Sequence, residues 1–271
     1  MLVDLFVILI DLAFTVLLTL FCVPTGRFYH YWAPFLLLIA GYLVGMALGW
    51  IILSIIAQFY SKNKEYKKPS ESALFWLSQS IGYINHHSGA RMKIIYNEPL
   101  PKERFLLVSN HLSKFDPMLL AEKYGHRLGL VFISKPSNFK IPIGGHFMKA
   151  SCYQGIERED KLKSLQTMNE ATRLISEDLA SVGVYPEGAR QKAPEDLADF
   201  HEGVFAIAQK ANCPIVITSI KGSEKIHKNF PWKFTKVKFQ VLKVLYPSDY
   251  QGMTCKTISL KARSLIEESL K

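Results

Sequence analysis

Two long apolar stretches open the chain. Residues 2–23 are nearly all apolar, apart from Asp4 and Asp11, and residues 33–59 contain one strongly polar residue, Gln58. At ~1.5 Å of rise per residue, a helix over the second stretch is longer than the ~30 Å hydrocarbon layer of a bilayer. The short aromatic segment between the stretches is typical of a membrane interface. The pattern therefore predicts a hydrophobic helical hairpin.

Other interpretations of these stretches are weaker. A secretory signal needs a basic segment before its apolar run, and no Lys or Arg precedes Arg27. A buried core hairpin is disfavoured because uncharged stretches of this length are rare in soluble cores. We expect residues 1–60 to form a membrane-inserted hairpin. Because Asp11 falls at mid-depth, a hairpin that dips into one leaflet stays open beside one that spans the bilayer.

The pattern changes after residue 60. Four lysines lie within residues 61–68, and this excess of positive charge predicts a cytoplasmic location for the rest of the chain. Residues 71–87 have the 3.6-residue apolar period of an amphipathic helix, which could lie on the membrane or pack on the domain. We expect residues 61–88 to form a basic linker and an interfacial helix.

From residue 89 onward, short apolar runs alternate with helical patterns. The predicted strands are residues 91–96, 105–109, 129–134, 152–156, 182–185, 214–220 and 237–245. The predicted helices are residues 117–124, 161–180, 200–211 and 254–270. This alternation predicts an α/β domain over residues 89–271, with a mixed sheet flanked by helices.

The charge is concentrated in this second part. The whole chain has 33 Lys and Arg against 23 Asp and Glu, and residues 1–60 hold one of the former and two of the latter. Residues 61–271 therefore carry 32 − 21 = +11. Such a surface suits anionic partners, although many membrane proteins are simply basic. The four cysteines form no C-x-x-C pair, so zinc and redox motifs are not indicated.

The first chemical candidate follows the predicted strand 105–109. His111 precedes Asp116 by five residues, and Asp116 is followed by Pro117. One interpretation is structural, because Asp is a preferred helix N-cap and Pro a preferred first helical residue. The other is catalytic: the carboxylate would fix the tautomer of the imidazole and leave its other nitrogen free to accept a proton.

The sequence offers no obvious nucleophile to go with this histidine. No G-x-S-x-G is present, and Ser113 is too close to His111 in sequence to be assumed to react. A base without a protein nucleophile indicates that the attacking hydroxyl belongs to the substrate. His86 and His87 have no other ligand at metal spacing nearby, so no metal site is expected.

Further basic residues follow other predicted strands. Glu187, Gly188 and Arg190 come after residues 182–185, and a glycine here permits an unusual backbone angle while an arginine can grip phosphate, although a tight turn with a surface ion pair is equally consistent. Arg158 and Lys135 follow two more strands, Lys135 in a segment expected to be a loop. Ligands of open α/β sheets gather at strand ends, so these groups could share one cleft.

Taken in order, these segments resemble the lysophosphatidic acid acyltransferase family, the 1-acyl-sn-glycerol-3-phosphate acyltransferases. Asn110–Asp116 resembles its N-H-x4-D block, and Tyr185–Arg190 resembles its F-P-E-G-T-R block. The weaker similarities are Gly155–Arg158, Pro214–Ile220, Lys135 with Pro142 and Gly144, and Phe200–Gly203. The departures are Ala189 for threonine, Glu157 for aspartate, Gly155 for a larger apolar residue and Thr218 for the closing proline.

The resemblance implies the glycerolipid acyltransferase fold and acyl transfer from a thioester to the hydroxyl of a lysophospholipid. His111 would be the general base, Asp116 its orienting partner, and Arg190, Arg158 and Lys135 the phosphate ligands, with Glu187 and Gly188 shaping the pocket. No cofactor is implied, since acyl carrier protein or coenzyme A supplies the acyl group as co-substrate. The implied location is the cell membrane.

The acceptor stays open. Lysophosphatidic acid, another lysophospholipid, a lyso-ornithine lipid and glycerol 3-phosphate are all compatible with the resemblance, and a non-catalytic membrane-binding module is the alternative from another class. Membrane lipids are expected partners. A nucleic-acid partner is not expected, because we identify no known module and no stretch of basic residues interleaved with exposed aromatic residues.

Overall fold

The computed structural model describes residues 2–22, 33–157, 159–193 and 197–271. The chain divides into two compact units, Met1–Tyr60 and Ser61–Lys271, which are described separately. The predicted aromatic linker between the two apolar stretches lies outside the described residues, as does Arg158.

The first unit contains two apolar helices, α1 (Leu2–Cys22) and α2 (Ala33–Gln58). Both are long and apolar enough to cross a membrane, and most of their surface is exposed. They approach each other through glycines, since a Cβ on Gly41 would lie 2.5 Å from Asp11 Oδ1. Small residues allow such close contact between membrane helices. Asp11 therefore faces the second helix.

The second unit is built on a seven-stranded mixed sheet, consistent with the predicted fold class. Its spatial order is β1-β7-β6-β2-β5-β3-β4. The strands are β1 (Ala90–Tyr96), β2 (Leu106–Ser109), β3 (Leu130–Ser134), β4 (Gln154–Gly155), β5 (Ser181–Val184), β6 (Ile215–Lys221) and β7 (Thr235–Leu245). The five strands from β6 to β4 run parallel to one another, while β7 is antiparallel to β6. All seven predicted strands are present, with bounds that shift by a few residues.

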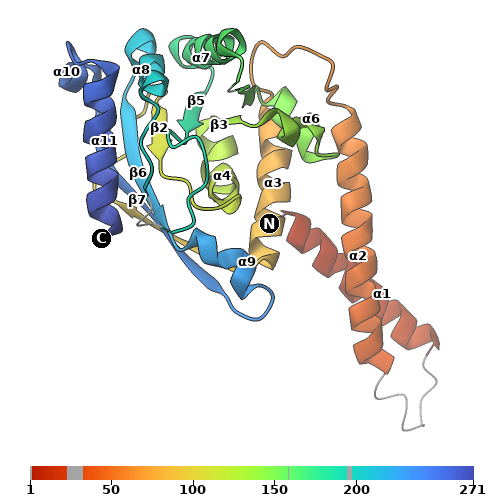
Figure 1. The fold of residues 1–271 in the computed structure, drawn as a ribbon. Coiled ribbons are helices and arrows are strands. Elements are labelled where there is room, and N and C mark those ends of the chain that lie inside the picture. The colour runs from red at the N-terminus through yellow and green to blue at the C-terminus, as the bar shows by residue number, and fades with distance from the viewer. Residues whose placement is uncertain (1, 23–32, 158, 194–196) are drawn as a thin grey trace. The chain divides into compact units, whose positions relative to one another are not determined.

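Helices cover both faces of this sheet (Figure 1). The α-helices are α3 (Glu71–His87), α4 (Phe115–Leu120), α5 (His126–Leu128), α6 (Gly144–Ala150), α7 (Lys161–Ser176), α8 (Ala206–Ala211), α9 (Ile226–Asn229), α10 (Pro247–Tyr250) and α11 (Cys255–Leu270). Short 3-10 or π turns span Ala121–Gly125, Pro136–Lys140, Glu202–Phe205 and Ser223–Lys225. Strands β2 and β5 are buried at every position, as expected for parallel strands covered on both faces.

Helix α3 has the bounds that the apolar period predicts. Ser70 caps its first turn by accepting a hydrogen bond from the backbone N–H of Ala73. Its buried face includes Leu74, Leu77 and Tyr83, and it packs against α4 and α6 within the second unit. Of the two placements left open, the structure contains the packing on the domain.

The segment after β3 differs from its prediction as a loop. It holds a 3-10 helix over Pro136–Lys140 and then α6, Gly144–Ala150. Two adjacent glycines and a nearby proline weaken the helical pattern here. Burial of Phe147, Met148 and Ala150 stabilises the helix nevertheless, because tertiary packing outweighs intrinsic propensity.

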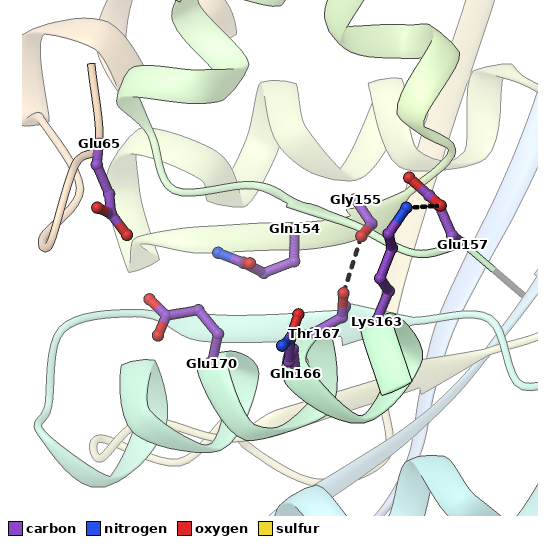
Figure 2. A pocket seen from close by; sticks show the side chains of 8 residues that line it. All are labelled: Glu65, Gln154, Gly155, Glu157, Lys163, Gln166, Thr167 and Glu170. Carbon is purple, nitrogen blue, oxygen red and sulfur yellow. Dashed lines mark hydrogen bonds and ion pairs between the residues drawn. The ribbon is translucent and has the colours of Figure 1, made fainter. Parts of the chain in front are cut away.

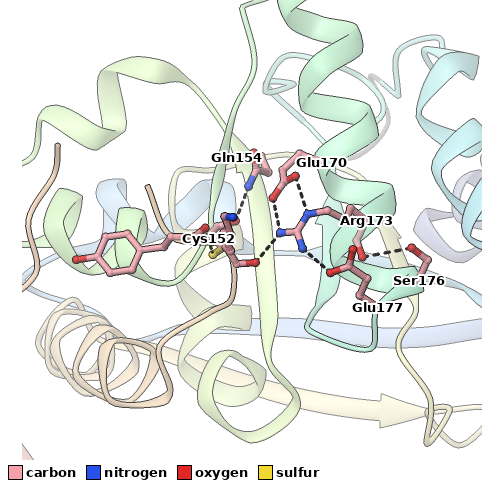
Figure 3. A network of polar contacts seen from close by, with 8 residues as sticks. Cys152, Gln154, Glu170, Arg173, Ser176 and Glu177 are labelled. Carbon is pink, nitrogen blue, oxygen red and sulfur yellow. Dashed lines mark hydrogen bonds and ion pairs between the residues drawn. The ribbon is translucent and has the colours of Figure 1, made fainter. Parts of the chain in front are cut away.

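The C-terminal end of the predicted basic linker is bound to the α/β domain. Figure 3 shows Arg173 of α7 between the carboxylates of Glu170 and Glu177. The same guanidinium donates to the backbone carbonyl of Lys67. The thiol of Cys152 donates to the carbonyl of Tyr66 at 3.1 Å. These contacts hold the backbone of the linker against α7 and the segment that precedes β4. The side chains of the linker lysines are not part of this network.

Candidate active site

One edge of the sheet collects the predicted site residues. Strands β2, β5 and β3 are neighbours and parallel, so their carboxyl ends lie at the same edge. His111 follows the end of β2 by two residues, Glu187 follows β5 by three, and Lys135 directly follows β3. The topology thus brings together groups that are far apart in sequence, as the strand-end argument predicted.

His111 and Asp116 are in direct contact. Nδ1 of the imidazole lies 2.8 Å from Oδ2 of Asp116, whose side chain is fully buried. The same oxygen accepts the backbone N–H groups of Leu112 and Ser113, each at 2.7 Å. Because α4 begins at Phe115, Asp116 lies in its first turn and not at the N-cap. The interpretation of Asp116 as the N-cap residue of α4 is therefore wrong.

This contact defines the chemistry available to the imidazole. A carboxylate only accepts hydrogen bonds, so in the neutral imidazole of His111 this contact favours the tautomer with the proton on Nδ1 and the lone pair on Nε2. The imidazole side chain is 17% exposed, and Nε2 has no hydrogen-bond partner among the described residues. A nitrogen in this state can accept a proton from a bound hydroxyl.

An aromatic ring supports the imidazole from one face. Tyr185 stacks on His111 with ring centroids 4.2 Å apart and an interplanar angle of 21°. Phe132 of β3 also stacks on Tyr185, with ring centroids 5.9 Å apart and an interplanar angle of 10°. Burial raises the pKa of the Tyr185 hydroxyl well above its ordinary value, and the nearby charge of Asp116 adds to the effect. The phenol stays neutral and acts as a packing surface. This role of Tyr185 was not predicted from the amino-acid pattern.

Glu187 connects the two loops instead of facing open solvent. Its Oε1 accepts the backbone N–H of His111 at 2.7 Å, and its Oε2 accepts that of Ala198 at 3.3 Å. The backbone N–H of Gln191 donates to the carbonyl of His111 at 2.8 Å. Gly188 has a φ of 70°, which residues other than glycine rarely adopt, and this backbone conformation turns the loop back. Burial raises the pKa of the Glu187 carboxyl above its ordinary value.

The basic candidates form the open part of the site. Arg190 and Lys135 are exposed, and neither side chain has a hydrogen-bond or ion-pair partner among the described residues. The alternative of a turn closed by a surface ion pair of Arg190 therefore does not hold for the described part of the chain. Arg158 lies outside it.

The block around Glu157 lines a separate pocket. This pocket, of about 400 Å³, lies between β4 and the N-terminal half of α7 (Figure 2). Glu157 is bound to Lys163 at 2.7 Å, and the hydroxyl of Thr167 donates to the carbonyl of Gly155. Glu65 and Glu170 also line the cavity, so its acidic side chains outnumber its one lysine and it is unsuited to phosphate. Within the described residues, no three His, Cys, Asp or Glu side chains group as a metal site.

Two residues near His111, the candidate base, have structural roles that were not predicted from the amino-acid pattern. Asn110 forms a two-point pair with the end of β6, donating to the carbonyl of Ile220 at 2.9 Å and accepting its N–H at 2.8 Å. Thr218, which stands where the family has proline, donates its hydroxyl to the carbonyl of Val108. The register of β6 and β7 shifts between Ile217 and Thr218, and proline is tolerated in sheets at such irregularities.

A mixed sheet between helices, preceded by two apolar helices and carrying a histidine–carboxylate pair at its strand ends, defines the glycerolipid acyltransferase fold. Residues 91–221 match the family model described as Acyltransferase. This match identifies residues 91–221, within the α/β unit, as an acyltransferase domain.

Several relatives agree with this assignment. The 1-acyl-sn-glycerol-3-phosphate acyltransferase of Saccharomyces cerevisiae is 25% identical over 70% of this chain and 60% of its own length. The Haemophilus influenzae enzyme of the same name is 26% identical over 75% of this chain and 82% of its own. The chain thus spans less than two thirds of the yeast relative.

A solved structure supports the fold. The crystal structure of the 1-acyl-sn-glycerophosphate acyltransferase PlsC from Thermotoga maritima aligns with a TM-score of 0.51 at 16% identity, over 99% of this chain and 93% of that one.

Proposed function

We propose that this protein is a membrane-bound O-acyltransferase that moves a fatty acyl group from a thioester to the free hydroxyl of lysophosphatidic acid, giving phosphatidic acid. The observation that carries the proposal is the 2.8 Å contact between His111 and a fully buried Asp116 at the open edge of the sheet. The names of the yeast and Haemophilus relatives support the same reaction.

The reaction needs no nucleophile from the protein. Nε2 of His111 takes the proton of the acceptor hydroxyl as its oxygen attacks the thioester carbonyl, and Asp116 stabilises the imidazolium that forms. The tetrahedral intermediate expels the thiolate, which receives the proton from His111. Positioned general-base catalysis commonly contributes ~10²–10⁴ in rate. Ser113 is not required, and its hydroxyl accepts the backbone N–H of Phe115 at 3.3 Å.

The acceptor phosphate would bind to the basic groups at the same edge. The side chains of Arg190 and Lys135 are exposed and have no hydrogen-bond or ion-pair partner among the described residues, so both can bind an anion. A guanidinium can bind two phosphate oxygens at once. Arg158, by the family resemblance, would complete this set. Glu187 and Gly188 would act by positioning, since they set the course of the loop that carries Arg190.

The two apolar helices supply the membrane attachment in this proposal. A one-chain lipid partitions into a bilayer leaflet, so an enzyme that uses it works at the interface. The exposed apolar surfaces of α1 and α2 suit insertion. The lysines of residues 61–68 favour the cytoplasmic side, where the thioester donors occur. Acyl carrier protein and coenzyme A are both acidic, which suits the charge of +11 on residues 61–271.

Mass spectrometry of the products tests the proposal. The full chain, reconstituted in vesicles, is given a mixture of lysophosphatidic acid, other lysophospholipids, lyso-ornithine lipid and glycerol 3-phosphate, with either acyl carrier protein or coenzyme A thioesters. We expect phosphatidic acid as the main product. A different acylated lipid as the main product would reassign the acceptor. If the folded protein gave no acylated product with any donor, a non-catalytic membrane-binding module would be the remaining interpretation.

A further inference from the structure

An exposed aromatic segment connects α9 to β7. This aromatic loop, residues 230–234, contains Phe230, Trp232 and Phe234, whose exposed fractions are 52%, 92% and 67%. Figure 1 shows α9 and the loop after it projecting beyond the sheet at the start of β7. Three large aromatic side chains in five residues, all exposed, form an apolar patch of a kind that commonly marks an interaction surface.

Lysines surround the aromatic side chains. Residues 221–238 hold six lysines and one acid, Glu224, which is a net 6 − 1 = +5. Lys228, Lys233 and Lys236 are exposed and flank or interrupt the loop. This stretch was not predicted, because no basic residues interleaved with exposed aromatic residues were identified from the amino-acid pattern.

The loop has a defined conformation. The Arg91 guanidinium carbon lies 4.6 Å from the centroid of the Phe234 ring. The amide of Asn229 donates to the hydroxyl of Thr235 at 2.8 Å, and the backbone N–H of Lys233 donates to the carbonyl of Asn229 at 2.8 Å. These contacts close the base of the loop while its aromatic side chains stay outside. A preorganised loop loses little conformational entropy on binding.

The segment that carries the loop starts at the edge of the sheet where His111 lies. Strand β6 is parallel to β2, so the chain that leaves β6 at Lys221 emerges at the same edge as His111. Asn110 precedes His111 in the sequence. Its side-chain amide donates a hydrogen bond to the backbone carbonyl of Ile220, near the end of β6, and accepts one from the backbone N–H of the same residue. Because β7 is antiparallel to β6, the loop before β7 lies at the same edge of the sheet as His111.

We propose that the aromatic loop docks on an anionic lipid surface, with its aromatic side chains in the interface and its lysines on the headgroups. Exposed Trp and Phe beside Lys are typical of protein segments that bind at membrane interfaces. Each lysine near an anionic lipid surface adds to the electrostatic attraction. The two apolar helices of the chain also favour a lipid over a nucleic acid as the partner. This contact would attach the chain to the membrane at a second place, in the unit Ser61–Lys271, in addition to the two apolar helices. It does not depend on acyl transfer.

The position of Trp232 in reconstituted vesicles tests the docking. Trp32, Trp50 and Trp76 are replaced by Phe in the full chain, so that Trp232 is the one remaining fluorophore. In vesicles of phosphatidylcholine and phosphatidylglycerol, we expect blue-shifted Trp232 emission that brominated lipids quench and aqueous acrylamide quenches poorly. If the triple variant does not fold, the difference spectrum between the wild type and Trp232→Phe gives the same readout.

Charge reversals supply the matched control. Lys228→Glu with Lys233→Glu should reduce quenching by brominated lipids, whereas Lys256→Glu with Lys261→Glu, also exposed but on α11, should not. Equal effects of the two pairs would show nonspecific attraction and overturn the proposal. Acrylamide quenching as strong as in free tryptophan would also overturn it. So would protection without bromine quenching, which indicates a second protein copy, or quenching by a single-stranded oligonucleotide. All readouts can be made with His111→Ala, so they are independent of the proposed chemistry.

Discussion

The two halves of the candidate site are built in different ways. The acid–base half is assembled before any substrate arrives: Asp116 is fully buried, and its Oδ2 accepts three hydrogen bonds, one of them from His111. The anion-binding half is open, because the side chains of Arg190 and Lys135 are exposed and have no hydrogen-bond or ion-pair partner among the described residues. One half is a hydrogen-bonded network already formed around Oδ2 of Asp116, and the other consists of exposed cationic side chains.

The difference follows from what each half has to do. A general base contributes to rate only when its lone pair is held at the reacting proton, so its orientation must be fixed by the protein. A phosphate ligand has to exchange water for an anion, and an exposed cation keeps its hydration until that anion binds. Loss of the first half should therefore affect turnover, and loss of the second should affect acceptor binding.

The largest expected effect comes from the base. His111→Ala removes the proton acceptor while leaving the bonds of Asp116 to Leu112 and Ser113, so the protein should fold and kcat should fall ~10²–10⁴-fold. Steady-state assays with saturating acceptor measure it. His86→Ala, an exposed histidine at the end of α3, is the control and should keep wild-type turnover. Full turnover of His111→Ala would end the assignment of the base.

A smaller effect is expected from the open half. Arg190→Ala should raise KM for the acceptor about 10–100-fold with little change in kcat, because a hydrogen bond to a charged group is worth about 1.5–3 kcal/mol. Initial rates against acceptor concentration separate the two constants. Lys102→Ala, which removes an exposed charge before β2 and thus at the other end of that strand, should change neither. If only KM for the thioester rises, Arg190 belongs to the donor site.

The stacked aromatic ring sharpens the comparison. Tyr185→Leu should lower kcat about tenfold without changing KM, since the ring at 4.2 Å helps to hold the imidazole of His111, and aromatic pairs contribute about 0.5–1.5 kcal/mol. Tyr185→Phe should restore turnover, because the buried hydroxyl has no hydrogen-bond partner among the described residues. A kcat for Tyr185→Phe as low as that of Tyr185→Leu would contradict this role and point to the hydroxyl.

The smallest effect is a change in stability with pH. The folded-state pKa of Glu187 is raised by burial, so the stability that this group contributes is present below the ordinary carboxyl value and is lost as pH rises through the raised value. Relative to Glu187→Gln, which does not titrate, the wild type should lose stability from about pH 4.5 upward, by about 1.4 kcal/mol for each pH unit between the ordinary pKa and the raised one. Thermal unfolding of both proteins from pH 4 to 7 measures the difference. A gap that stays constant with pH would mean that the pKa of the carboxyl is not raised.

Local patterns were enough to predict the strands and the acid–base pair. The apolar runs predicted all seven strands, and the helical period predicted α3 with its observed bounds, because both signals come from residues close in sequence. His111 and Asp116 are five residues apart, so one turn brings them together. In contrast, α6 was missed because its stability comes from burial of Phe147 and Met148 and not from its own helix propensity.

Contacts between distant residues were beyond such patterns. The role of Glu187 depends on a hydrogen bond to the backbone of His111, 76 residues away, and the pairing of Asn110 with Ile220 spans 110 residues. The exposure of Trp232 was equally hidden, since an aromatic residue beside a strand is more often buried than exposed. A signal existed in the alternation of lysine and aromatic residues over residues 228–236, but only the structure reveals that these side chains face outward.

The amino-acid sequence by itself determined the apolar helices, the order of strands and helices, the basic charge of the second unit and the proximity of His111 to Asp116. Each of these depends on composition or on interactions within a few residues, where the chain has few conformations to choose from. The tertiary structure decided which strands are neighbours, that Glu187 joins the loops after β2 and β5, and that the segment carrying the aromatic loop leaves the sheet at the edge where His111 lies. Those arrangements depend on the burial of side chains from distant segments, and a local pattern does not specify which segments meet.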